Sequence, residues 1–173
     1  LQQELFRKFA EQKLNQSLKT WTKQKITIEN CFRNCRKSVL LVFLTAENTA
    51  AGADVLTYTL CMEEMSKVDA STGITLSVHT SLCCPCINEF GTEEQKQKYL
   101  RPLVDGSKIG CFGLTEPGAG TDAAGVKTTA DKTEDGKYNV LNGTKMFTTN
   151  SGFADTFIVF ALKDKSKGPK GMS

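Results

Sequence analysis

The hydrophobic periodicity of the chain changes near Ser107, and this change constrains the fold more than any other feature of the sequence. Before that point, apolar residues recur at helical spacing, which predicts amphipathic or buried helices. After it, apolar and polar residues alternate, as is typical of strands. Helices followed by antiparallel strands form the α+β class, so we predict a helical N-terminal domain and the start of a β domain.

Local signals predict where the helices begin and end. We expect a first helix over residues 1–12, a second beginning at the N-cap residue Asp54, and a third over residues 75–87, with residues 69–73 as an interruption. Thr92 to Gln95 is a capping box that opens a last helix, which runs toward Leu103. The second helix should bury one apolar stripe and leave Glu63, Glu64 and Lys67 elsewhere; the stripe comprises Val55, Tyr58, Met62 and Met65.

Turn residues divide the second half of the chain into strands. Residues 127–131 and 138–142 flank the segment 134–137, whose glycine suits a hairpin turn. Residues 145–149 and 156–162 are the remaining predicted strands, and the last is apolar enough to be central.

Residues 110–122 form the clearest candidate for a ligand site. They read Gly-Cys-Phe-Gly-Leu-Thr-Glu-Pro-Gly-Ala-Gly-Thr-Asp, an apolar strand that enters a proline-glycine turn. Gly118 and Gly120 have no Cβ, so a flat or phosphorylated ligand could approach the backbone closely and accept hydrogen bonds from its N–H groups. The segment lacks the Lys-Ser/Thr of a P-loop and no helix-forming run follows it, so its spacing alone does not define the ligand.

Together with residues 142–150, Asn-Gly-Thr-Lys-Met-Phe-Thr-Thr-Asn, this segment resembles the flavin-contacting pair of segments in acyl-CoA dehydrogenases, and in particular the short-chain, butyryl-CoA type. The resemblance covers residues 1–12 and 52–173 in the family's order. It also rests on four further segments, 54–73, 77–82, 90–100 and 155–160.

The resemblance implies an FAD-dependent enzyme that dehydrogenates a short-chain acyl-CoA to the trans-2-enoyl-CoA, in fatty acid β-oxidation or butyrate metabolism. It implies the family's helical N-terminal domain over residues 1–107 and part of its β-barrel-like middle domain over residues 108–173. Because the chain begins without Met and stops at Ser173, we expect an N-terminal fragment without the family's C-terminal helical domain. The expected partners are an acyl-CoA substrate, an electron-transfer flavoprotein and further copies in a homotetramer.

The resemblance also predicts the cofactor-binding residues, which are Phe112, Leu114, Thr115, Gly120, Thr121, Phe147, Thr148 and Thr149. The strand positions up to Thr115 would line the isoalloxazine ring, and Thr121 would contact both the cofactor and the acyl-CoA substrate. Phe147 would pack on the flavin, and Thr149 would donate a hydrogen bond toward flavin N5.

Some of these residues depart from the family pattern or have a simpler interpretation. Thr148 occupies a place that is usually apolar, and Ser151 one that is usually Gly. Phe147, Thr148 and Thr149 could also be plain strand and core residues, since aromatic and β-branched residues are common in strands. Glu116 precedes a proline and is interpreted as an acceptor that fixes the turn. We therefore predict no catalytic residue in this chain, because the family's base is a Glu of the C-terminal part.

Composition excludes several classes of partner. The net charge is +3 with both signs interspersed, so no basic stripe predicts nucleic-acid binding. The longest apolar run, residues 39–44, is far below the roughly 20 residues that span a bilayer. We expect no membrane span, no secretory signal and a cytoplasmic protein with reduced cysteines. Cys83, Cys84, Cys86 and His79 lack zinc spacing, so no metal site is predicted, and His79 is interpreted as a packed helix residue.

Residues 13–51 do not follow the family pattern. Residues 42–49 can be encoded so that regrouping the codons by one base gives Gly-Ile-Pro-Tyr-Ser-Arg-Glu-Tyr, which is family-like, and residues 13–21 and 37–41 behave alike. We interpret this segment as a frame slip, with true divergence as the alternative. Two other readings of the chain stay open, a non-catalytic product of a damaged or incomplete gene and another flavoprotein of the superfamily, such as an acyl-CoA oxidase.

Overall fold

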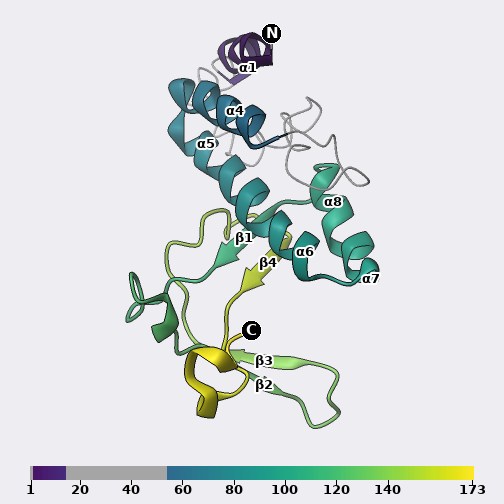
Figure 1. Ribbon diagram of the computed structural model, residues 1–173, viewed down its shortest axis with the longest axis vertical. Helices are drawn as coiled ribbons and strands as arrows, with labels where there is room; N and C mark the ends of the chain where they lie inside the picture. The colour runs from purple at the N-terminus through teal and green to yellow at the C-terminus, as the bar shows by residue number, and fades with distance from the viewer. Residues whose placement is uncertain (1, 15–53) are drawn as a thin grey trace. The chain divides into compact units, whose positions relative to one another are not determined.

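The computed structural model describes residues 2–14 and 54–173, which form two units (Figure 1). The first unit comprises Leu1–Cys111 and Thr149–Thr156, and the second comprises Phe112–Thr148 and Phe157–Ser173. The predicted frame slip over residues 13–51 lies outside the described residues except for its first two positions.

The first unit is built from helices. Its N-terminal helix α1 (Gln2–Phe9) continues as η1 (Ala10–Leu14). A second helical run follows, with a break at Asp69, and consists of α4 (Val55–Val68), α5 (Ala70–Ser77), η2 (Val78–Cys83) and α6 (Cys84–Phe90). The last run consists of α7 (Glu93–Gln95), η3 (Lys96–Leu100) and α8 (Arg101–Val104).

Side-chain caps begin these helices where the sequence predicts them. The Asp54 carboxylate accepts a hydrogen bond from the Thr57 N–H at 2.8 Å, and the capping box from Thr92 to Gln95 is complete. The interruption expected over residues 69–73 is wrong in extent. Asp69 ends α4 and caps α5 through the Thr72 N–H at 2.7 Å, so the helical run resumes at the next residue.

The buried stripe of α4 differs from the predicted one. Its buried residues are Thr57, Cys61, Glu64 and Met65, whereas Val55 is 70% exposed. Met65 and Cys61 belong to a core cluster with residues of α1, η1 and α5 and with the residue before β1; these are Phe6, Ala10, Leu76 and Ile109.

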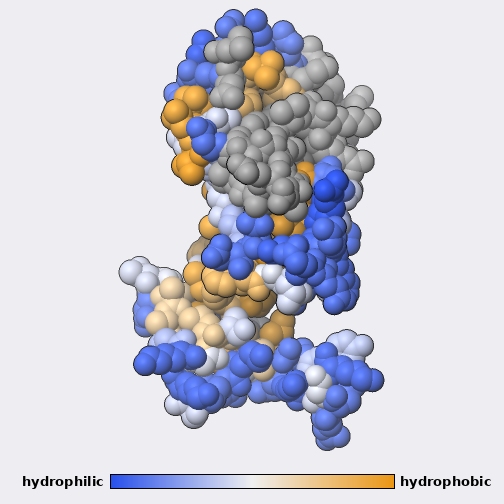
Figure 2. Space-filling view, turned by 45° about the vertical axis from the view of Figure 1, so that its right-hand side comes forward, coloured by the Kyte–Doolittle hydropathy of each residue, from blue (hydrophilic) through white to orange (hydrophobic). Residues whose placement is uncertain are grey.

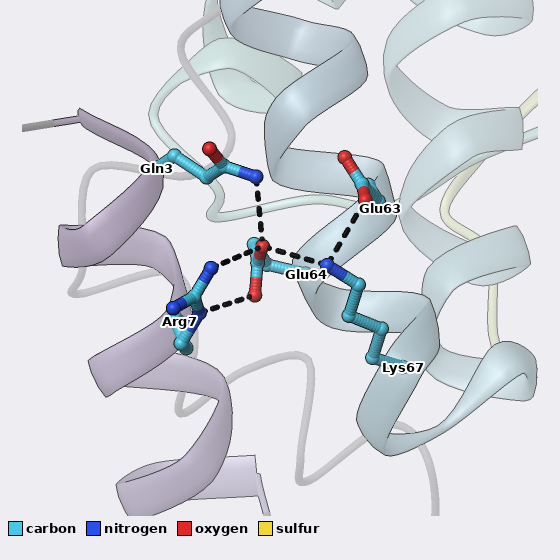
Figure 3. Close-up of polar contacts among 5 residues, drawn as sticks. All are labelled: Gln3, Arg7, Glu63, Glu64 and Lys67. Carbon is cyan, nitrogen blue, oxygen red and sulfur yellow. Dashed lines mark hydrogen bonds and ion pairs between the residues drawn. The ribbon is translucent and has the colours of Figure 1, made fainter.

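Glu64 is buried because its carboxylate is fully engaged (Figure 3). It accepts hydrogen bonds from Gln3 Nε2 at 3.0 Å, Arg7 Nε at 3.2 Å and Lys67 Nζ at 2.9 Å, so it links α1 to α4. The hydrogen bonds from Arg7 and Lys67 lower the pKa of Glu64 to about 2, against the opposing effect of burial. The sequence-based prediction treated charged residues as exposed. It therefore missed a buried carboxylate that is bound by Gln3 and Arg7 of another helix as well as by Lys67 of its own.

The strands form two-stranded sheets in the described part of the chain. β2 (Thr129–Lys132) pairs antiparallel with β3 (Asn139–Asn142), in a register that runs from Thr129 opposite Asn142 to Lys132 opposite Asn139. This hairpin is the predicted one, and the turn glycine, Gly136, has φ +69°. Hydrophilic residues cover much of the surface at the bottom of Figure 2, where the hairpin lies.

β1 (Gly110–Gly113) pairs with β4 (Thr156–Val159), and both strands lead from the first unit into the second. The Ile109 carbonyl accepts from the Thr156 N–H, and the Gly113 carbonyl accepts from the Phe160 N–H. These bonds follow the same order along both strands, so this pair is parallel, in contrast to the antiparallel strands expected throughout.

The strand predicted over residues 145–149 is not formed. The segment is irregular, with Phe147 at φ 54° and Asn150 at φ 74°, and neither conformation fits a ladder. The strand predicted over residues 156–162 ends at Val159, although Leu162 still bridges to Thr129 and Met172. Among the described residues, no helix is long and apolar enough to span a bilayer.

Candidate functional site

The first candidate segment, residues 110–122, begins with strand β1, continues through half-buried residues after the strand and then forms a turn. The rings of Phe112 and Phe160 lie 5.1 Å apart, which anchors the strand end in the second unit. Leu114 and Thr115 are half-buried. The Met146 N–H donates to the Thr115 carbonyl at 2.8 Å, so this segment is joined to the second candidate segment through the backbone.

The turn that follows is closed and its outer side is open. Glu116 and Ala119 exchange two backbone hydrogen bonds, each of 3.1 Å. A Cβ added at Gly118 or Gly120 would meet no atom within 4 Å, so the glycines leave open space beside the backbone. The N–H groups of Gly120 and Thr121, which are exposed, donate to no acceptor within the described residues.

Glu116 fixes this turn, as the sequence predicted. Its carboxylate is 7% exposed and accepts from the Lys127 N–H at 2.6 Å and the Thr128 N–H at 3.0 Å. Lys145 Nζ adds an ion pair at 2.7 Å. Burial raises the pKa of Glu116, but the hydrogen bonds from Lys145, Thr128 and Lys127 outweigh it and bring that pKa to about 2. A carboxylate so occupied is a poor proton acceptor, so Glu116 is not suited to be a catalytic base.

The second candidate segment presents an aromatic ring to solvent. Phe147 is 84% exposed and has a positive φ, which is a costly combination for a bulky residue and is typical of functional sites. The hydroxyl oxygen of Thr148 is buried and has no partner among the residues that the structure describes. Phe147 and Thr148 belong to the second unit with the strand and turn, whereas Thr149 belongs to the first.

Asn150 holds the chain directly after Thr149, and sequence reasoning missed it. Its Nδ2 donates to the carbonyls of Thr75 at 3.1 Å and Gly110 at 3.0 Å, within the first unit. Asn tolerates the left-handed backbone better than most residues, which suits the φ of 74°. The tripeptide Thr-Asn-Ser offered this signal, because Asn is common where a strand gives way to a turn.

His79 is a packed helix residue, as predicted. It is fully buried, and its Nδ1 accepts from the Gly110 N–H at 3.0 Å. Because a backbone N–H only donates, Nδ1 is unprotonated and the ring is neutral. Burial lowers the pKa of His79 to about 4, although a backbone hydrogen bond with Leu103 opposes the shift.

The cysteines in the described part of the chain are free thiols, and most of them are buried. Burial raises the pKa of Cys83 to about 12 and that of Cys111 to about 11. Thiols with such values are protonated near neutral pH and behave as small hydrophobic residues, not as nucleophiles or metal ligands. Within the described residues, no group of three or more His, Cys, Asp or Glu side chains could hold a metal ion.

The second unit offers what a flat, polar cofactor needs. The turn provides exposed N–H groups that have no acceptor among the described residues and lie beside open space, and Phe147 provides an exposed aromatic face. Such features fit a ring system with hydrogen-bond acceptors along one edge, such as the isoalloxazine of a flavin.

Comparison with known protein families agrees with this reading. The family model for the acyl-CoA dehydrogenase N-terminal domain matches residues 1–107, and the model for the middle domain matches residues 111–173. The chain belongs to the acyl-CoA dehydrogenase family. The predicted family and the predicted α+β fold class are therefore confirmed.

Individual relatives of the chain are short-chain members of that family. A short-chain specific acyl-CoA dehydrogenase of Clostridium acetobutylicum is 49% identical over 150 residues, which are 87% of this chain and 39% of the relative. The structure of butyryl-CoA dehydrogenase from Megasphaera elsdenii matches with a TM-score of 0.88 and 44% identity, over 99% of this chain and 45% of that one.

A third match is a structure of an acyl-CoA dehydrogenase complexed with FAD from Bacillus anthracis, with a TM-score of 0.84 and 34% identity. It covers 93% of this chain and 28% of the other. The chain thus spans less than half the length of these relatives.

Proposed function

We propose that this chain is part of an FAD-dependent, short-chain acyl-CoA dehydrogenase. It would supply the N-terminal helical domain and part of the flavin-binding surface of that enzyme. The observation that carries the proposal is the joined pair of segments in the second unit, where open N–H donors and the exposed ring of Phe147 occur together. The short-chain and FAD-complexed relatives support the same cofactor and substrate class.

Residues of both segments would hold the cofactor. Phe112, Leu114 and Thr115 would line the ring system, and the exposed N–H groups of Gly120 and Thr121 would donate to it. When bound, FAD supplies the hydride-accepting chemistry of the reaction. Phe147 would pack against the flavin, and the Thr149 hydroxyl would donate a hydrogen bond toward N5, where negative charge increases on reduction.

Substrate would meet the same surface. Thr121 is exposed, and its hydroxyl would contact the acyl-CoA as well as the cofactor. The proton at the α carbon needs a base with a higher pKa than Glu116, whose pKa lies at about 2. We propose that this base is a carboxylate outside this chain, as in the family pattern.

We further propose that the enzyme transfers its electrons to an electron-transfer flavoprotein, assembles as a homotetramer and works in the cytoplasm. These proposals rest on the resemblance to short-chain members of the family.

The test is anaerobic reduction of the flavin. The complete gene product that contains this chain would be purified, loaded with FAD and mixed with butyryl-CoA or palmitoyl-CoA. Bleaching of the flavin band by butyryl-CoA in preference to palmitoyl-CoA is the expected result. A product that binds FAD but is not bleached by either thioester would contradict the proposed activity. Rapid reoxidation by oxygen after bleaching would instead indicate an acyl-CoA oxidase.

A further inference from the structure

A buried ion pair joins the two candidate segments of the second unit. Lys145 Nζ lies 2.7 Å from Glu116 Oε1 and also donates to the Leu114 carbonyl at 3.0 Å. The side chains of Lys145 and Glu116 are 12% and 7% exposed. One ammonium group therefore binds the strand end and the turn at once, from a segment about thirty residues away in the chain.

The residues proposed to contact flavin lie next to this ion pair on both sides. Leu114 and Thr115 directly precede Glu116, and Phe147 and Thr148 follow Lys145 within three residues. The Met146 N–H, one residue after Lys145, donates to the Thr115 carbonyl at 2.8 Å. Lys145 thus sits at the point where a displacement of one segment would be passed to the other.

The turn at Glu116 is already closed by backbone hydrogen bonds, without the ion pair to Lys145. The backbone N–H groups of Lys127 and Thr128 already bind Glu116, and Ala119 already pairs with it through the backbone. Lys145 contributes the only cation that the described residues bring to this carboxylate. A buried pair of charges gains little net stability, whereas removal of one partner leaves the other charge uncompensated. Such a pair is better explained by the geometry that it imposes than by stability.

We propose that Lys145 is a positioning residue for the cofactor. Through Glu116 and the Leu114 carbonyl, it sets the spacing between the strand-turn segment and the segment that carries Phe147. This inference rests on the proposed flavin function. The Lys145 ammonium group is taken up by Glu116 and the Leu114 carbonyl, so its effect would be on cofactor affinity and on the environment of the bound ring.

The test compares Lys145→Met with Lys145→Arg in the complete gene product, with Lys137→Met as a matched control. Lys137 is an exposed lysine of the hairpin, so this control removes one positive charge at a position outside the candidate site. FAD affinity would be measured by titration of the apoprotein, and the visible circular dichroism of bound FAD would report the ring's surroundings. Hydrogen exchange at the Met146 amide would be measured in the apoprotein.

The expected result for Lys145→Met is a rise in the FAD dissociation constant of about tenfold or more, a changed circular dichroism band and faster exchange at Met146. Lys145→Arg should restore most of the affinity, because a guanidinium group can also bind a carboxylate and a carbonyl. Lys137→Met should match the wild type. If Lys145→Met does not fold, Glu116→Gln removes the same ion pair with a smaller change and should weaken FAD binding likewise.

Two results would overturn the inference alone. The first is wild-type FAD affinity and circular dichroism in Lys145→Met. The second is faster exchange at Met146 with unchanged FAD binding, which would make the ion pair purely structural. Failure of the wild-type protein to bind FAD at all would overturn the proposed function together with this inference, so the two failures are distinguishable.

Discussion

Glu116 has a structural role in the turn, although its place in the predicted ligand segment could suggest a catalytic one. Its carboxylate lies in the predicted ligand segment, yet its oxygens are bound by two backbone N–H groups and by Lys145. Phe147 and Asn150 adopt left-handed backbone conformations, which do not occur in a regular strand. At this scale, Glu116 and Asn150 fix the backbone of the candidate site through their hydrogen bonds.

Replacement of Thr149 by Val tests the proposed donor to flavin N5. The two side chains have nearly the same shape, so the loss is confined to the hydroxyl. In the complete gene product, we expect flavin reduction to slow by one to three orders of magnitude, from a loss of roughly 1.5–4 kcal/mol per donor. Single-turnover reduction by butyryl-CoA measures this. Thr144→Val, at an exposed position of the same segment, is the control and should keep the wild-type rate. Equal rates in both variants would show that Thr149 is only structural.

His79 should make stability depend on pH in a defined window. Its pKa is about 4 in the folded state, below the usual value near 6.5, so the unfolded state binds more protons between these pH values. Stability is therefore fully present above about pH 6.5, falls as the pH decreases toward 4 and then levels off. At about 1.4 kcal/mol per pKa unit, the loss is up to about 3 kcal/mol.

Urea unfolding at a series of pH values measures this effect, because His79 is the only histidine of the chain. A His79→Gln variant should show a much flatter profile between pH 6.5 and 4. Glu64 and Glu116, whose pKa values are lowered to about 2, should reduce stability only as the pH falls below their usual value near 4.5. The same slope in the wild type and the variant would contradict the assignment.

At the scale of elements, local capping signals placed the helix starts correctly, whereas periodicity predicted only part of the buried stripe of α4. The caps at Asp54 and Thr92 lie where the sequence places them, because they depend on three or four consecutive residues. The stripe of α4 was misread, since Glu64 turns inward to Gln3 and Arg7 of α1. Position along one helix carries no information about charges supplied by another.

Removal of the Thr92 cap gives a prediction for the last helical run. Thr92 Oγ1 accepts from the Gln95 N–H at 3.3 Å, and Gln95 Oε1 accepts from the Thr92 N–H at 2.9 Å. Thr92→Ala should lower the free energy of unfolding by about 1 kcal/mol, whereas Thr92→Ser should retain nearly all of it. Chemical denaturation of both variants provides the comparison. Equal losses would indicate that the side-chain methyl group matters and the hydroxyl does not.

At the scale of the whole molecule, the chain passes between the two units at β1 and again at residues 148–149 and 156–157. The candidate site residues up to Thr148 therefore fold with the second unit, and Thr149 folds with the helical one. Among the described residues of the helical unit, Val55 and Leu56 of α4 are exposed large hydrophobic residues.

The predicted frame slip over residues 13–51 leads to a further prediction. Out-of-frame residues would not have been selected to cover apolar side chains, and Val55 and Leu56 are 70% and 65% exposed. A chain that carries the regrouped, family-like sequence should be more stable by about 3 kcal/mol or more, from the burial of two such side chains. Denaturant unfolding of the two chains measures the gain. A genomic read with residues 13–51 in the same frame as Thr115, and no insertion or deletion on either side, would contradict the premise.

The sequence by itself determined the order of helices and strands, the caps, the hairpin at Gly136 and the family, because each depends on neighbouring residues or on motifs in a fixed order. Only the tertiary structure decided that Glu64 is buried, that residues 145–149 are not a strand and that Lys145 reaches Glu116. Each of those outcomes depends on a partner distant in the sequence, and the free energy of a buried charge is set by that partner.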